Sequence, residues 1–122
     1  MLLTNEKIYN YANKLAEAFE DSEQRLPVKI NFYLQKNKKV LIDLAQDIEQ
    51  SRLSIAKANG TYNAEKGQYA IAPDKVENAQ KELSELFEIE QEVDIYTINI
   101  DTIDENLMLT TAQMEALLFM ID

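Results

Sequence analysis

The 122-residue chain carries 22 acidic and 12 basic side chains, a net charge of −10, and it contains no histidine, cysteine or tryptophan. These counts exclude histidine-dependent triads, thiol nucleophiles, disulfide frameworks and zinc sites built from cysteine and histidine. The acidic balance argues against direct binding to duplex nucleic acid, whose affinity depends on neutralising phosphates. Gly60 and Gly67 are isolated, so no glycine-rich phosphate loop is present. We therefore expect a non-enzymatic protein with no cofactor and no bound metal.

The length predicts a single domain over residues 1–122. At 46% hydrophobic the chain can bury a core, and its two glycines and two prolines disfavour a fold made of many tight hairpins. No apolar run approaches the roughly 20 residues of a membrane span, and the N-terminus lacks the pattern of a secretion signal. We expect no membrane association and an intracellular location.

The first predicted element along the chain is a helix over residues 4–20. Its apolar residues recur on one face, and Thr4 suits the position that caps the first turn. The residues of this face are Ile8, Ala12, Leu15 and Phe19.

The longest predicted helix covers residues 27–59, with Pro27 at its first position and Asn59-Gly60 as its end, where the glycine is free to adopt a positive φ. Apolar residues repeat every seven positions, while three of the four residues in the companion row are small or polar. This pattern favours a helical hairpin over a free-standing coiled coil. The two rows are Leu34, Leu41, Ile48 and Ile55, and Asn37, Leu44, Ser51 and Ala58.

A connector with a short strand at residues 68–72 leads to a helix over residues 74–92, in which Asp74 and Glu77 form a capping box. We expect this helix to pack antiparallel on the long one, through Val76, Ala79, Leu83, Leu86 and Phe87. Residues 93–100 are rich in β-branched and aromatic side chains, which predicts a second strand. The economical arrangement pairs it with residues 68–72.

The final predicted element is a helix over residues 111–121. Thr110 and Gln113 are spaced as a capping box. Its expected buried face consists of Met114, Leu117, Leu118 and Ile121. The predicted fold is therefore α+β and mostly α: a long antiparallel helical hairpin, a short two-stranded β-ribbon, and flanking N- and C-terminal helices.

Charge is distributed unevenly along this fold. Residues 75–122 hold two basic and twelve acidic side chains, a net −10, whereas Lys29, Lys36, Lys38 and Lys39 make the front of the long helix positive. One interpretation is that the acids only solvate helix surfaces. The other is an acidic strip that binds a protein with a basic surface. The strip would comprise Glu82, Glu85, Glu88, Glu90, Glu92 and Asp94.

A second group of oxygen ligands follows the predicted strand, at Asn99, Asp101, Asp104 and Glu105. Such residues could coordinate Mg²⁺ or Ca²⁺, but their spacing does not fit an EF-hand loop and its glycine is absent. A polar turn is the favoured interpretation. The six tyrosines are open to two interpretations as well, half-buried core edges or anchors of an interface.

Several short stretches, spread over most of the chain, resemble segments of a known protein family in their order and spacing. They are Leu26-Pro27-Val28-Lys29-Ile30-Asn31-Phe32, Lys36-Asn37, Ile48-Glu49-Gln50-Ser51-Arg52, Tyr69-Ala70-Ile71-Ala72-Pro73, Lys81-Glu82-Leu83, and Leu109-Thr110-Thr111-Ala112-Gln113-Met114 with Phe119-Met120-Ile121. Together they resemble a family of small phage and prophage proteins of unknown function. The resemblance implies a phage or mobile-element origin and action in the bacterial host cytoplasm or in the virion. It brings no known active site.

Two functions remain open from the sequence. The first is a small phage-encoded inhibitor that binds a host factor, such as a defence nuclease or another nucleic-acid-handling machine. The alternative is a phage assembly or structural accessory protein that acts as a homo-oligomer. A regulator of replication or transcription is a third possibility.

Overall fold

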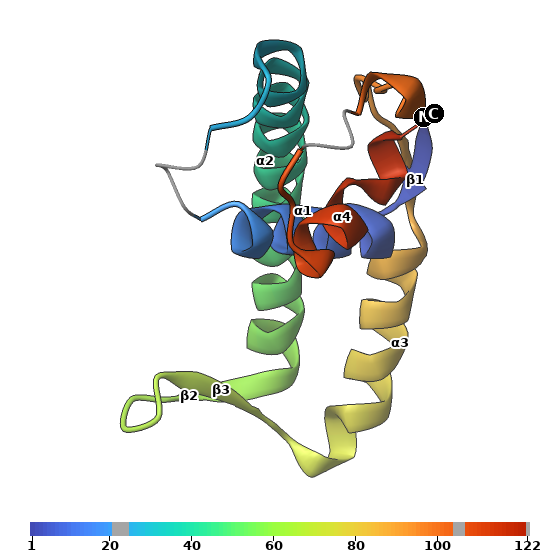
Figure 1. Ribbon diagram of the computed structural model, residues 1–122. Helices are drawn as coiled ribbons and strands as arrows, with labels where there is room; N and C mark the ends of the chain where they lie inside the picture. The colour runs from blue at the N-terminus through green and yellow to red at the C-terminus, as the bar shows by residue number, and fades with distance from the viewer. Residues whose placement is uncertain (21–24, 104–106, 122) are drawn as a thin grey trace.

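The computed structural model describes residues 1–20, 25–103 and 107–121. In these residues the chain forms four α-helices and two small, two-stranded antiparallel sheets (Figure 1). The α+β, mostly helical class predicted from the sequence is confirmed. The long helix α2 (Val28–Asn59) has 32 residues, which corresponds to roughly 48 Å at 1.5 Å per residue, and the other elements are arranged along it.

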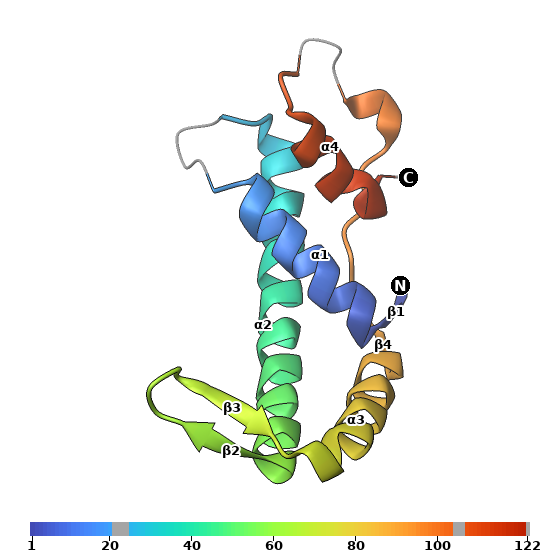
Figure 2. The same ribbon diagram turned by 90° about the horizontal axis from the view of Figure 1, so that it is seen from below.

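Helix α1 (Asn5–Ala18) crosses α2 obliquely and covers its middle (Figure 2). Three members of its predicted apolar face, Ile8, Ala12 and Leu15, are buried, whereas the fourth, Phe19, is half-buried and lies just after the helix. Thr4 caps the helix as expected, with its hydroxyl oxygen accepting a hydrogen bond from the backbone N–H of Lys7 at 3.2 Å. Ahead of the cap, the chain forms the short strand β1 (Leu2–Thr4), which the sequence did not predict.

The heptad row of α2 forms the centre of the core along the first two-thirds of the helix. Leu34, Leu41 and Ile48 are at most 3% exposed, whereas Ile55 is only half-buried. In the companion row the polar Asn37 is completely buried. Pro27 lies just before the helix rather than inside its first turn.

The predicted pairing of residues 68–72 with residues 93–100 is wrong. Strand β3 (Gln68–Ile71) pairs instead with β2 (Gly60–Asn63), which directly follows α2. Residues 93–100 pass Asn37, near the other end of the helix. Asn37 and Gly60 are separated by roughly 35 Å along the helix at 1.5 Å per residue, so the two segments cannot meet.

Position 60 requires glycine for a different reason from the one predicted. Its backbone is extended, with φ −154°, rather than left-handed. A Cβ atom there would lie 2.4 Å from the carbonyl oxygen of Ala70. Ala70 precedes Ile71, the residue that pairs with Gly60 across the hairpin. Glycine is therefore required by the close approach of two backbones. Gly67, in the hairpin turn, is the glycine with positive φ, at +64°.

Helix α3 (Val76–Glu88) runs antiparallel to the C-terminal half of α2, as predicted, after a 3-10 turn at Pro73–Lys75 (Figure 1). It ends earlier than predicted, because Glu90–Glu92 form strand β4 and pair with β1. The predicted capping box of Asp74 and Glu77 does not form, since the 3-10 turn makes Lys75 the residue before the helix. The apolar stripe of α3 is incompletely covered, and Ala79 is its buried member.

Residues 93–100 do not form the predicted strand. Outside regular structure, Ile98 makes an isolated parallel bridge with Ile121 and its N–H donates to the carbonyl of Met120 at 2.7 Å. The backbone groups of Val93, Tyr96 and Ile98 bond to three different partners, Met1, Asn37 and Met120, rather than to one neighbouring strand.

The final helix α4 (Thr111–Leu117) has the predicted Thr110–Gln113 capping box and continues as a 3-10 turn at Leu118–Met120. Its buried face is rotated by about one residue from the predicted one. The Gln113 side chain points into the protein, and the residues on the same side of the helix as Gln113 are buried with it. Met114 and Leu118 are 36% and 61% exposed. The buried residues are Gln113, Ala116, Leu117 and Met120.

Candidate functional site

The six acidic residues predicted as a strip separate into two groups. Glu82 is half-buried on the side of α3 that faces the end of α2, where its Oε1 accepts hydrogen bonds from Asn78 at 2.7 Å and from Asn59 at 3.1 Å. Asn59 is itself 2% exposed, and its side chain also accepts from Asn78. Glu82 therefore joins α3 to α2 and is removed from the candidate binding surface.

The other five acids are exposed and follow one another along α3, β4 and the residue beyond it. Glu92 binds the N-terminal ammonium group at 2.7 Å. We refer to this group as the acidic face. Its members are Glu85, Glu88, Glu90, Glu92 and Asp94.

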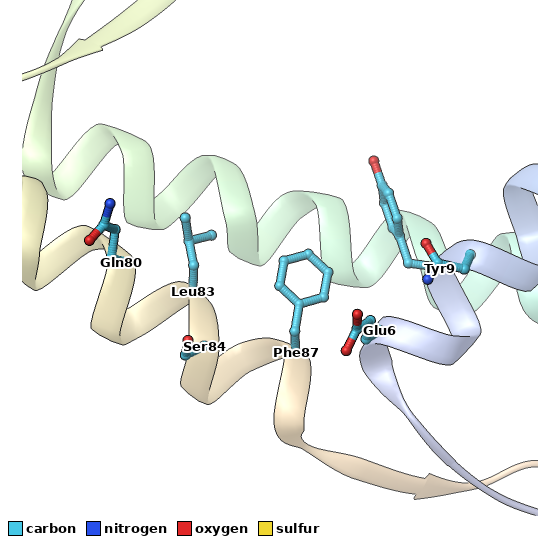
Figure 3. A pocket seen from close by; sticks show the side chains of 7 residues that line it. Glu6, Tyr9, Gln80, Leu83, Ser84 and Phe87 are labelled. Atoms are coloured by element: carbon cyan, nitrogen blue, oxygen red, sulfur yellow. The ribbon is translucent and has the colours of Figure 1, made fainter.

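A groove, absent from the sequence predictions, opens beside α3. It has a volume of about 480 Å³, and its walls are the exposed side of α1 and the incompletely covered stripe of α3 (Figure 3). We call it the α1–α3 groove. Its lining consists of Glu6, Tyr9, Asn10, Gln80, Leu83, Ser84 and Phe87.

Tyr9 connects this groove to the long helix. Its ring meets Phe87 edge to face, with ring centroids 5.9 Å apart, and its hydroxyl donates to Glu49 on α2 at 3.2 Å. The Arg52 guanidinium, which donates to the same carboxylate at 2.9 Å, holds the pKa of Glu49 below its ordinary value, with a smaller contribution from Tyr9. Charge-assisted hydrogen bonds to Glu49 on α2 thus hold Tyr9, and with it this wall of the groove, in place.

A second surface that sequence reasoning missed lies on the N-terminal half of α2. Val28 is 81% exposed and Phe32 is 52% exposed, and the ammonium group of Lys36 lies 5.5 Å from the centroid of the Phe32 ring. Their spacing, continued by Lys39, places all four on the side of α2 opposite the buried row. We call them the α2 stripe. The available signal was the apolar pair Val28 and Phe32, four residues apart and out of phase with the heptad row.

The oxygen ligands proposed after residue 98 provide no evidence for a metal site. Asn99 uses its side-chain oxygen to accept the N–H of Asp101 at 2.9 Å, which caps a 3-10 turn at Ile100–Thr102. Asp104 and Glu105 lie outside the described residues. In residues 1–20, 25–103 and 107–121, no three carboxylates gather closely enough to hold a metal ion.

Comparison with known protein families, with curated proteins and with solved structures finds no match to this chain. The resemblance to phage proteins therefore remains a prediction. Among the helices of the described residues, none combines the length and the apolar character needed to cross a membrane.

Proposed function

We propose that this protein acts by binding a protein partner with a basic surface, and that the acidic face makes the contact. One observation carries the proposal: five acids between residues 85 and 94 are exposed, Glu92 among them although it binds the N-terminal ammonium group, whereas Glu82 is half-buried and joins α3 to α2. Exposed like charges on adjoining elements raise the local potential and accelerate encounters with an oppositely charged partner.

The finer proposal follows the phage resemblance. The protein would be a phage-encoded inhibitor of a host factor, such as a defence or nucleic-acid-handling machine, in the host cytoplasm. Machines that handle nucleic acid carry basic surfaces for phosphates, and a carboxylate-rich face is suited to occupy such a surface. No catalytic step is required of the protein in this role.

The test reverses charge on the acidic face without disturbing the Glu82 network. Wild-type protein and the variant E85K/E88K/E90K are immobilised and exposed to a bacterial host lysate at low salt, and bound proteins are identified by mass spectrometry. We expect the variant to lose a partner that the wild type retains, and elevated salt to release it. The control D43K/D47K/E65K makes the same change in net charge at exposed positions elsewhere. Equal capture by wild type and E85K/E88K/E90K would contradict the proposal.

A second candidate function, assembly or structural support as a homo-oligomer, is favoured by the α2 stripe. Val28 and Phe32 present apolar surface to solvent beside Lys36. Apolar surface with a polar rim is typical of protein contact sites. In this role the partner would be another copy of the chain.

A further inference from the structure

We propose that the α2 stripe of one copy docks into the α1–α3 groove of another copy. The inference deepens the second candidate function, association of the chain with itself, by naming the two surfaces that meet. It does not depend on the acidic face.

The groove supplies an apolar floor and a negative edge. Tyr9, Leu83 and Phe87 provide the apolar lining, and Glu6 provides the charge. Among the residues that the structure describes, no lysine or arginine lines it. A volume of about 480 Å³ falls within the range of about 300–1,000 Å³ that is usual for binding pockets. The groove is therefore suited to an aromatic ring accompanied by an ammonium group.

The α2 stripe presents these two groups together. Residues 26–42 contain four lysines and no acidic residue, so this half of α2 is positive within a chain of net −10. Phe32 is 52% exposed, and the ammonium group of Lys36 already lies over its ring. A phenylalanine placed in the groove against Tyr9 and Phe87 would make aromatic contacts, while the lysines would approach Glu6.

The occupant must be a second copy rather than the same chain. The stripe lies on the side of α2 opposite Leu34 and Leu41, which are buried in the core. It therefore points away from its own groove, which is formed by α1 and α3. The repulsion between two copies of net −10 is screened beyond about 8 Å at physiological ionic strength, so the local attraction decides the contact.

The experiment is sedimentation velocity on the full chain at physiological salt, up to about 1 mM, a concentration that populates even a weak complex. We expect concentration-dependent association. A dimer indicates reciprocal docking and a larger species indicates head-to-tail docking, and both support the proposal. A wild type that remains monomeric over the whole range overturns it.

Two charge variants identify the surfaces. K36E/K39E makes the stripe acidic and E6K/Q80K makes the groove basic, so each variant alone should associate at least about tenfold more weakly. A 1:1 mixture should recover association, because each stripe then meets a groove of opposite charge. K57E/K66E is the control for K36E/K39E, with the same net charge and an unaltered stripe. A mixture that associates no better than either variant alone overturns the proposal.

The aromatic anchor is tested separately with F32S, which removes an exposed ring without unpacking the core. We expect its dissociation constant to rise at least about tenfold, whereas L118S, a change at another exposed apolar residue, should leave it unaltered. Unchanged association of F32S overturns the proposal. E85K/E88K/E90K should still self-associate, so failure of this proposal and failure of the acidic face are distinguishable. Thermal unfolding of every variant verifies that it is folded.

Discussion

The side-chain amide of Asn37 replaces a β-strand partner for the backbone of Tyr96. Its Nδ2 donates to the Tyr96 carbonyl and its Oδ1 accepts from the Tyr96 N–H, both at 2.8 Å. Asn37 is completely buried in the heptad region of α2. A single polar side chain thus attaches the segment after β4 to the long helix.

Replacing Asn37 with alanine should destabilise the fold by about 2–4 kcal/mol, because it leaves a donor and an acceptor without partners at a part-buried site. The free energy of unfolding, measured by urea denaturation, tests this. Asn31→Ala, at an exposed position on the same helix, is the matched control and should change stability by no more than about 0.5 kcal/mol. Similar effects of the two substitutions would show that the amide contributes little.

Asn37 also illustrates what could and could not be predicted from the sequence. The heptad row and the caps at Thr4 and Thr110 were predictable, because they depend on local spacing. The pairing of residues 93–100 was not, because a buried asparagine 59 positions earlier in the chain provides its partner. Local β-propensity carries no information about such a distant contact.

The candidate surfaces, too, could be predicted from the sequence only in part. The acidic composition of residues 85–94 was evident from the chain, but the internal use of Glu82 depends on Asn59 and Asn78, which reach it from the end of α2 and the preceding turn of α3. The groove requires the first half of α1 to lie next to the second half of α3 with a gap between their side chains. That arrangement follows from the β1–β4 pairing, for which three-residue strands give almost no sequence signal.

The β2–β3 hairpin provides a second prediction, at Gly60. Gly60→Ala would place a methyl group 2.4 Å from the Ala70 carbonyl oxygen, so the hairpin must shift, with an expected cost of about 1–3 kcal/mol. Gly67→Ala meets no neighbouring atom but retains φ +64°, which should cost about 1–2 kcal/mol. Both are measured by chemical denaturation. The amide NMR shifts of residues 60–71 should change widely in Gly60→Ala and only near the turn in Gly67→Ala.

Gln113 provides a third prediction, because it stabilises two helix ends at once. Its Oε1 accepts the Thr110 N–H at 3.0 Å, and its Nε2 donates to the carbonyl of Ala18 in α1 at 2.9 Å. Gln113→Ala removes both bonds and should lower the free energy of unfolding by about 1–3 kcal/mol. Gln46→Ala, an exposed change on α2, serves as control. A loss of stability equal to that of the control would contradict the assignment.

The pH dependence of stability gives a fourth prediction, at Glu49. The hydrogen bond from Arg52 lowers the pKa of this carboxyl in the folded protein below its ordinary value of 4.5. A lowered folded-state pKa means that the stabilisation is complete above the ordinary value and is lost as the pH falls through the folded one. Both side chains remain partly exposed, Glu49 by 33% and Arg52 by 44%, so solvent screens the pair and its contribution is less than about 1 kcal/mol.

Glu49→Gln should therefore be slightly less stable than wild type at neutral pH, and the difference should disappear as the solution is acidified below the folded-state pKa of Glu49. Urea denaturation at a series of pH values measures this difference. Glu65→Gln removes a carboxylate in the exposed hairpin turn and controls for the change in net charge. The double variant E49Q/R52Q isolates the coupling between the two side chains. If the difference in stability between Glu49→Gln and wild type stayed constant into the acid range, the contact with Arg52 would not be stabilising the ionised form of Glu49.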